Sequence, residues 1–146
     1  MTFKKIFIYL CICSVAVACM ETKHDEGKEK LEAVCDKFMD HFSRGGFHTA
    51  YTLLRTNSTI GDSVINDIEE KSPTQMASLK PTYGKILSHT LVANYSAKDV
   101  VAKRYYILRF DRSFLKFSFT MYNNGRSWVI TGFSYDEDVN DVLSSQ

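Results

Sequence analysis

The sequence lacks a long hydrophobic run. Its first apolar stretch, Ile6 to Val17, ends after roughly a dozen residues, whereas about 18 or more are needed to cross a bilayer. No second candidate follows along the 146 residues of the chain. A membrane-spanning helix is therefore not expected.

The short motifs of common catalytic, metal and nucleotide sites are also missing. The chain has no HExxH sequence and no paired CxxC to bind a metal, and no G-x-S-x-G turn to hold a nucleophile. Its glycine pair, Gly45-Gly46, follows a predicted helix, where a phosphate-binding loop would precede one. We therefore expect neither a metal nor a cofactor.

An excess of positive charge is absent as well. The chain carries 18 Lys and Arg against 17 Asp and Glu, without a basic block. Such a balance offers no electrostatic footprint for nucleic acid, so no nucleic-acid partner is expected. Hydrophobic residues make up 45% of the chain and aromatic residues 13%, which is enough to pack a core. One domain, over residues 28–146, is the simplest organisation.

The N-terminus has the pattern of a targeting segment. Lys4 and Lys5 precede the apolar run, and the small residues Ala16-Val17-Ala18 end it, as a signal peptidase requires. We therefore interpret residues 1–18 as a signal peptide, and the polar residues 19–27 as a tether to the domain.

The junction at Cys19 resembles the bacterial lipobox, in which the cysteine thiol is acylated and cleavage leaves a lipid-modified N-terminus. Ala16 departs from that pattern, which prefers leucine at the third position before the cysteine. The resemblance implies a lipid anchor at Cys19 in a bacterial cell envelope, facing the periplasm. Met20, where aspartate would retain a lipoprotein in the inner membrane, implies the outer membrane. The alternative is ordinary secretion with a free Cys19, which is then able to form a disulfide with Cys35.

The first half of the domain has helical spacing. A helix from about Asp25 to Ser43 is predicted by apolar residues at Leu31, Cys35, Phe38 and Phe42, and Gly45-Gly46 ends it. A shorter helix is predicted around Phe47, Ala50, Tyr51 and Leu54. A third is predicted over residues 61–70, followed by an irregular connection between Pro73 and Pro81.

From Gly84 the hydrophobic period changes to two, which predicts strands over residues 85–95, 100–110, 114–122 and 127–135. Short connections make these an antiparallel meander. A two-residue turn at Asn124-Gly125 would pair Met121 with Trp128 and place Gly132 on the packed face. The expected apolar face, which the helices must cover, consists of Tyr106, Leu108, Phe110, Phe117, Phe119, Met121, Trp128 and Ile130.

This order of elements, with "YGKILSHTLV", "YYILRF", "FLKFSFTMY" and a tryptophan followed by "GF" in the last strand, resembles the NTF2-like (cystatin-like cone) superfamily over Lys28 to Asp138. The resemblance implies an α+β fold in which helices pack on a strongly curved four-stranded antiparallel meander. In that superfamily the sheet and helices enclose a cone-shaped pocket, which is catalytic, binds a small molecule or partner, or is filled.

Two hypotheses for the function follow. The first is a lipid-anchored, non-enzymatic module that binds a small apolar or anionic ligand or a protein partner. Arg104, on the same face as Tyr106, either lies at the rim with its head in water or enters an open pocket, where Arg104, Tyr106 and Trp128 bind an acid. The second is an NTF2-like enzyme with an acid/base group in the cone, for which His89 and Tyr106 are the candidates. Asp36 and Asp40 are expected on a solvated helix face.

Overall fold

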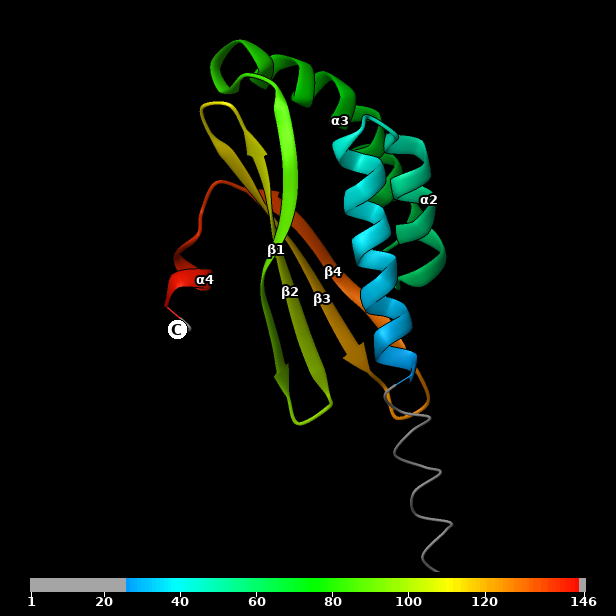
Figure 1. The fold of residues 1–146 in the computed structure, drawn as a ribbon. Coiled ribbons are helices and arrows are strands. Elements are labelled where there is room, and N and C mark those ends of the chain that lie inside the picture. The colour runs from blue at the N-terminus through cyan, green and yellow to red at the C-terminus, as the bar shows by residue number, and fades with distance from the viewer. Residues whose placement is uncertain (1–25, 145–146) are drawn as a thin grey trace, which may run out of the picture.

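The computed structural model describes residues 26–144. The predicted signal peptide, Cys19 and residues 19–25 of the predicted tether lie outside the described residues. The described chain has the α+β architecture expected from the sequence, with helices on one face of a four-stranded sheet and a short C-terminal helix on the other (Figure 1). Among the described helices, none is long and apolar enough to cross a membrane.

The first helix covers residues 26–43, in agreement with the predicted helix, and we call it the 26–43 helix. The residues that defined its apolar stripe, Leu31, Cys35, Phe38 and Phe42, are all buried. It ends at Gly45, whose φ of 80° is in the left-handed region that glycine adopts without a side-chain clash. The amide of Gly46 closes the end by donating to the carbonyl of His41.

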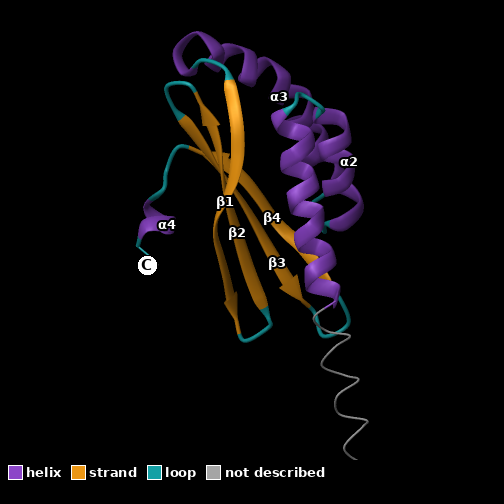
Figure 2. Cartoon of the chain, in the orientation of Figure 1, coloured by secondary structure: helices purple, strands orange, loops and turns teal. Residues whose placement is uncertain are grey.

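Two further helices complete the layer beside the sheet (Figure 2). Helix α2, Phe47–Asn57, buries Ala50, Tyr51 and Leu54, as its spacing predicted. Helix α3, Asp62–Tyr83, is much longer than the predicted helix and runs through both prolines. In Figure 1 it leads from α2 across one end of the sheet to the first strand.

The prediction that helix α3 stops before Pro73 was wrong for a physical reason. Proline removes only one N–H donor from the helix, and tertiary packing compensates for the loss. The buried residues Ile65, Ser72, Met76 and Tyr83 keep one helical stripe on both sides of Pro73. The Tyr51 hydroxyl also lies 2.7 Å from the Ser72 Oγ, immediately before the proline.

The sheet is the predicted antiparallel meander, in the order β1-β2-β3-β4. Its strands are β1 Ile86–Ala97, β2 Val101–Phe110, β3 Phe114–Asn123 and β4 Trp128–Asp136. After β4 the chain crosses to the other face and forms helix α4, Asn140–Leu143. The sheet is open, since β1 and β4 are its edges, so the strongly curved cone is not confirmed.

The predicted register between β3 and β4 was wrong. Trp128 pairs with Asn123 rather than with Met121, because the loop contains four residues, 124–127, instead of two. Within this loop Gly125 takes a positive φ of 86°. The side-chain oxygen of Asn124 accepts hydrogen bonds from the amides of Arg126 and Ser127. The side chain of Asn124 thus organises the wider loop.

A second irregularity lies between Thr120 and Met121, which pair with Gly132 and Ile130 respectively. Thr131 is therefore an extra residue, a β-bulge. Beyond it Phe133 pairs with Phe119 and joins the face covered by the helices, whereas the regular alternation of a strand would place it on the opposite face. Gly132 lies opposite Thr120 on the other face, which corrects its predicted place in the packed layer.

The interior between helices and sheet is filled by side chains. All eight residues of the predicted apolar face are buried. Phe38 packs against Phe119 and Phe133 at ring-centroid distances of 5.3 and 5.0 Å. Phe42 lies 4.9 Å from Phe117. The centre of this layer is thus an aromatic core.

Candidate ligand-binding site

Arg104 is neither at a rim nor in an open pocket. Its side chain, only 5% exposed, is enclosed between β2 and the 26–43 helix. Nη1 lies 3.0 Å from the Glu32 carboxylate and Nη2 lies 2.8 Å from that of Asp36. Nε donates to the hydroxyl of Tyr106 at 2.9 Å. The carboxylates that Arg104 binds therefore belong to the 26–43 helix of the same chain.

Tyr106 belongs to the same cluster. Its hydroxyl donates to the Asp36 carboxylate while it accepts from Arg104. Burial raises the pKa of Tyr106 far above its ordinary value, and the hydrogen bond to Asp36 raises it further. A phenol that holds its proton so firmly is a poor acid or base near neutral pH. The arrangement joins helix to sheet, and Tyr106 is not suited to proton transfer.

The structure does not bring Trp128 to this cluster. Arg104 pairs with Phe119, whereas Trp128 pairs with Asn123, four residues further along β3. At about 3.3 Å per residue, that separation is roughly 13 Å. Trp128 is buried, as predicted, and Lys28 lies over its ring at 5.8 Å from the centroid. The three residues predicted to bind one ligand therefore do not form one site.

The side chains of Asp36 and Asp40 are 54% and 49% exposed, as expected for a solvated helix face, but this face also borders the sheet. Glu32, Asp36 and Asp40, one helical turn apart, meet Asn94, Arg104 and His89 respectively. The His89 Nε2 lies 3.6 Å from the Asp40 Oδ1, and both residues line an open pocket of about 420 Å³. Asp40 also lies 3.6 Å from Arg44. His89 therefore has a carboxylate beside it in a solvent-facing recess.

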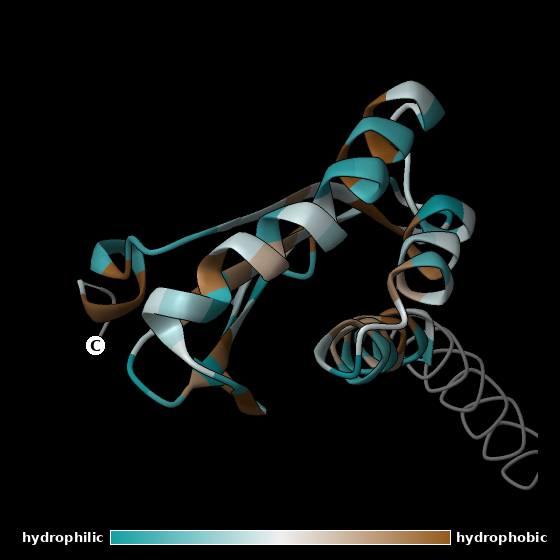
Figure 3. Cartoon of the chain, turned by 90° about the horizontal axis from the view of Figure 1, so that it is seen from above, coloured by the Kyte–Doolittle hydropathy of each residue, from teal (hydrophilic) through white to brown (hydrophobic). Residues whose placement is uncertain are grey.

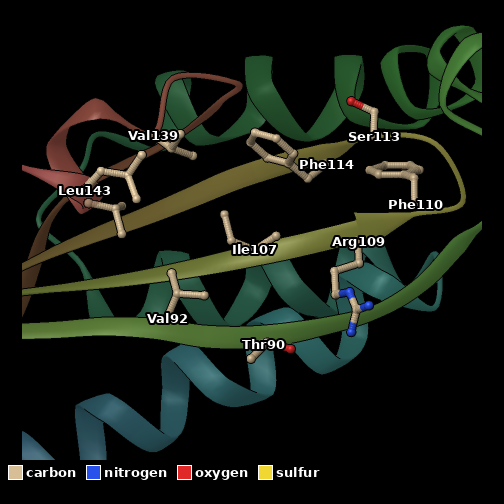
Figure 4. A pocket seen from close by; sticks show the side chains of 10 residues that line it. Thr90, Val92, Ile107, Arg109, Phe110, Ser113, Phe114, Val139 and Leu143 are labelled. Atoms are coloured by element: carbon tan, nitrogen blue, oxygen red, sulfur yellow. The ribbon is translucent and has the colours of Figure 1, made fainter.

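A larger recess lies on the opposite face of the sheet, and we call it the outer pocket (Figure 4). Its volume is about 680 Å³, in the range of about 300–1,000 Å³ typical of small-molecule sites. Strands β1, β2 and β3 form its floor, and the segment around α4 forms one wall. The lining residues are Thr90, Val92, Ile107, Arg109, Phe110, Ser113, Phe114, Val139, Val142 and Leu143.

The wall of the outer pocket is fixed by a buried cation. The Lys116 Nζ, on a side chain 5% exposed, lies 2.8 Å from Asp141 and 3.2 Å from Asp136. The hydroxyl of Tyr95 donates to the carbonyl of Val142, whose side chain is buried. Burial raises the pKa of Asp141, but the hydrogen bonds from Lys116 and Tyr105 and the charge of Lys116 together outweigh it, so the pKa lies below its usual value. These contacts dock α4 on the sheet.

Arg109 is the charged residue of the outer pocket. It alternates with Leu108 and Phe110 along β2 and is exposed on the outer face. Figure 4 shows Arg109 toward one end of the pocket, with Val139 and Leu143 at the other. Within residues 26–144, no carboxylate forms an ion pair with Arg109. The pocket thus has an apolar end and a cationic end.

Sequence reasoning missed this site because it considered only the face of the sheet that the helices cover. The signal was present in the last residues, where Val139, Val142 and Leu143 are spaced as on one face of a helix. Such a segment needs a surface to cover, and the outer face of the sheet is the nearest one. Ile107 and Phe114, in alternation with the core residues, were the corresponding signal in the strands.

Within the described residues, no group of three His, Cys, Asp or Glu side chains is placed to hold a metal ion. The chain as a whole matches no family model, no curated protein and no solved structure. What the residues themselves establish is an α+β domain with an aromatic core, an ionic cluster between helix and sheet, and an apolar pocket on the outer face of the sheet.

Proposed function

We propose that this protein is a non-enzymatic binding module for a small apolar molecule, which occupies the outer pocket. The observation that carries the proposal is the pocket itself, about 680 Å³ in volume and lined mainly by aliphatic and aromatic side chains. Concave, mostly apolar recesses with a few polar groups are the usual form of small-molecule sites. The interior of the domain, by contrast, is occupied by its own aromatic rings.

Exposure of the lining residues supports the proposal. Val92 is 42% exposed and Leu143 is 62% exposed, although both are large hydrophobic residues beside other apolar groups. Exposed apolar surface concentrated at one recess is typical of a binding site. A bound apolar ligand would remove this surface from water.

The test is saturable binding of the neutral fluorescent probe N-phenylnaphthylamine. Val92→Trp should abolish binding, because the larger side chain fills the recess. Val101→Trp is the matched control, since Val101 is a strand valine of similar exposure, 37%, and is not part of the pocket lining. Equal binding by both variants, or no binding by the folded wild-type protein, would contradict the proposal.

The same proposal includes a lipid anchor at Cys19 and a location at the bacterial cell envelope, facing the periplasm and held in the outer membrane. It is supported by the apolar run, the small residues before Cys19 and the residue Met20 after it. An NTF2-like origin of the domain is also part of the proposal. Helices that precede a four-stranded meander support it.

A second candidate is an acid/base enzyme, and the observation in its favour is His89 beside Asp40 in an open pocket. It ranks lower because the Asp40 carboxylate lies as close to Arg44 as to His89, 3.6 Å from each, and so is shared between them. His89→Ala distinguishes the two candidates. Its probe binding should equal that of the wild type if the outer pocket is the functional site, because His89 lies on the other face of the sheet.

A further inference from the structure

We propose that the ligand of the outer pocket is a single-chain amphiphile with one carboxylate, such as a fatty acid, whose headgroup is bound by Arg109. This inference rests on the proposed function and specifies its ligand class. The chain of the amphiphile would lie along Ile107 toward Val139 and Leu143, and its carboxylate would lie at the opposite end of the pocket.

Arg109 differs from the two buried cations of β2 and β3, Arg104 and Lys116. Arg104 is paired with Glu32 and Asp36, and Lys116 with Asp136 and Asp141. Each of these two buried cations therefore has two carboxylates from this chain. Arg109 has none among residues 26–144, so its guanidinium, at the border of the apolar recess, is available to an anionic ligand.

The lining of the outer pocket has polar groups near Arg109 and apolar groups at its far end. The polar side chain of Thr90 lies near Arg109 in Figure 4, whereas the far end of the pocket is formed by Val139 and Leu143. A guanidinium beside a hydroxyl suits a planar carboxylate, which accepts hydrogen bonds from both. A ligand with polar groups at both ends would leave one of them unpaired against the apolar wall, at a cost in binding.

The charge of the pocket favours a ligand with a single negative charge. One guanidinium balances one negative charge, so a monoanion fits better than a phosphate that carries two. Because Arg109 is exposed, its attraction for the headgroup should weaken as salt is added, whereas the apolar contribution should not. The preference for an acid is therefore expected to depend on ionic strength.

The experiment compares cis-parinaric acid with its methyl ester, which has the same chain without the charge, by fluorescence titration near neutral pH. The wild-type protein should bind the acid about tenfold more tightly or better, the lower range for a charge-assisted hydrogen bond. In Arg109→Ala and Arg109→Gln this ratio should fall to about one. Arg126→Ala removes an exposed arginine from the β3–β4 loop and should keep the wild-type ratio.

The outcomes separate this inference from the proposed function. Equal affinity of the wild type for acid and ester, or a preference that survives in both Arg109 variants, overturns the carboxylate inference while the apolar site stands. No saturable binding of acid, ester or N-phenylnaphthylamine overturns both. Circular dichroism and the thermal midpoint establish that each variant is folded, and Arg109→Gln retains a long side chain if the alanine variant is unstable.

Discussion

At the scale of single residues, Arg104 has the strongest expected effect on stability. Its replacement by alanine would leave Glu32 and Asp36 without their cation and remove the donor to Tyr106. We expect Arg104→Ala to lower the free energy of unfolding by about 1–3 kcal/mol, less than for a fully buried ion pair that loses one partner, because water hydrates the half-exposed Asp36 carboxylate. The change is measured by urea denaturation.

The control for this prediction is Arg126→Ala, which changes the net charge equally but at an exposed loop residue. Its effect should lie within about 0.5 kcal/mol of zero. Tyr106→Phe should have an intermediate effect, because it removes one hydroxyl from the cluster and leaves both ion pairs of Arg104 intact. If Arg104→Ala and Arg126→Ala have the same denaturation midpoint, the ionic cluster does not contribute to stability.

At the scale of elements, the docking of α4 should depend on pH. The folded pKa of Asp141 lies below its ordinary value of 3.8, so the stabilisation that its ionised carboxylate provides is present above that pH and is lost as the pH falls through the folded pKa. Burial lowers the pKa of Lys116, but its hydrogen bonds to Asp141 and Asp136 outweigh this, so the pKa lies above 10.5 and Lys116 stays charged throughout. The methyl resonances of Val142 and Leu143 should therefore move toward random-coil values in acid.

The methyl resonance of the core residue Ile130 is the internal reference for this titration. It should stay in place while those of Val142 and Leu143 move. Asp141→Asn should show the displaced resonances already near neutral pH, because the neutral amide forms a weaker bond with Lys116. Simultaneous movement of all three resonances would mean that the whole domain unfolds and that α4 has no separate transition.

At the scale of the whole molecule, we expect the mature chain to begin at a lipid-modified Cys19. Mass spectrometry of the protein isolated from bacterial membranes should find Cys19 at the N-terminus with an added lipid mass. Cys19→Ser should be released from the membrane fraction, whereas Cys35→Ser should remain there, because Cys35 is a buried thiol of the core. An unmodified Cys19, or one joined to Cys35 by a disulfide, would contradict the anchor.

Much of the fold could be predicted from periodicity. Leu31, Phe38 and Phe42 identified a helix because burial imposes its period on the sequence, and the alternation in β2 and β3 identified one buried face in the same way. The extension of α3 through Pro73 could not be predicted, because the packing that compensates for the missing N–H comes from residues distant in the chain. Local preferences are visible in a sequence, whereas tertiary compensation is not.

The candidate site was less predictable for a related reason. Arg104 was singled out correctly as a cation on the apolar face, but its partners come from a helix more than 60 residues earlier in the chain. The sequence does not indicate which carboxylate meets it. Arg109 was overlooked since exposed arginines are common, and only the docking of Val139, Val142 and Leu143 turns its surroundings into a pocket.

The bulge at Thr131 determines which residues in the second half of β4 face the core. Because strand residues alternate between two faces, one extra residue exchanges inside and outside for everything that follows it. Phe133 and Tyr135 reach the aromatic core only because the bulge shifts the alternation by one residue. If Thr131 instead took a regular place in the ladder, opposite Thr120, the same residues would face the other way: Phe133 and Tyr135 would face the solvent, and Ser134 would face the core.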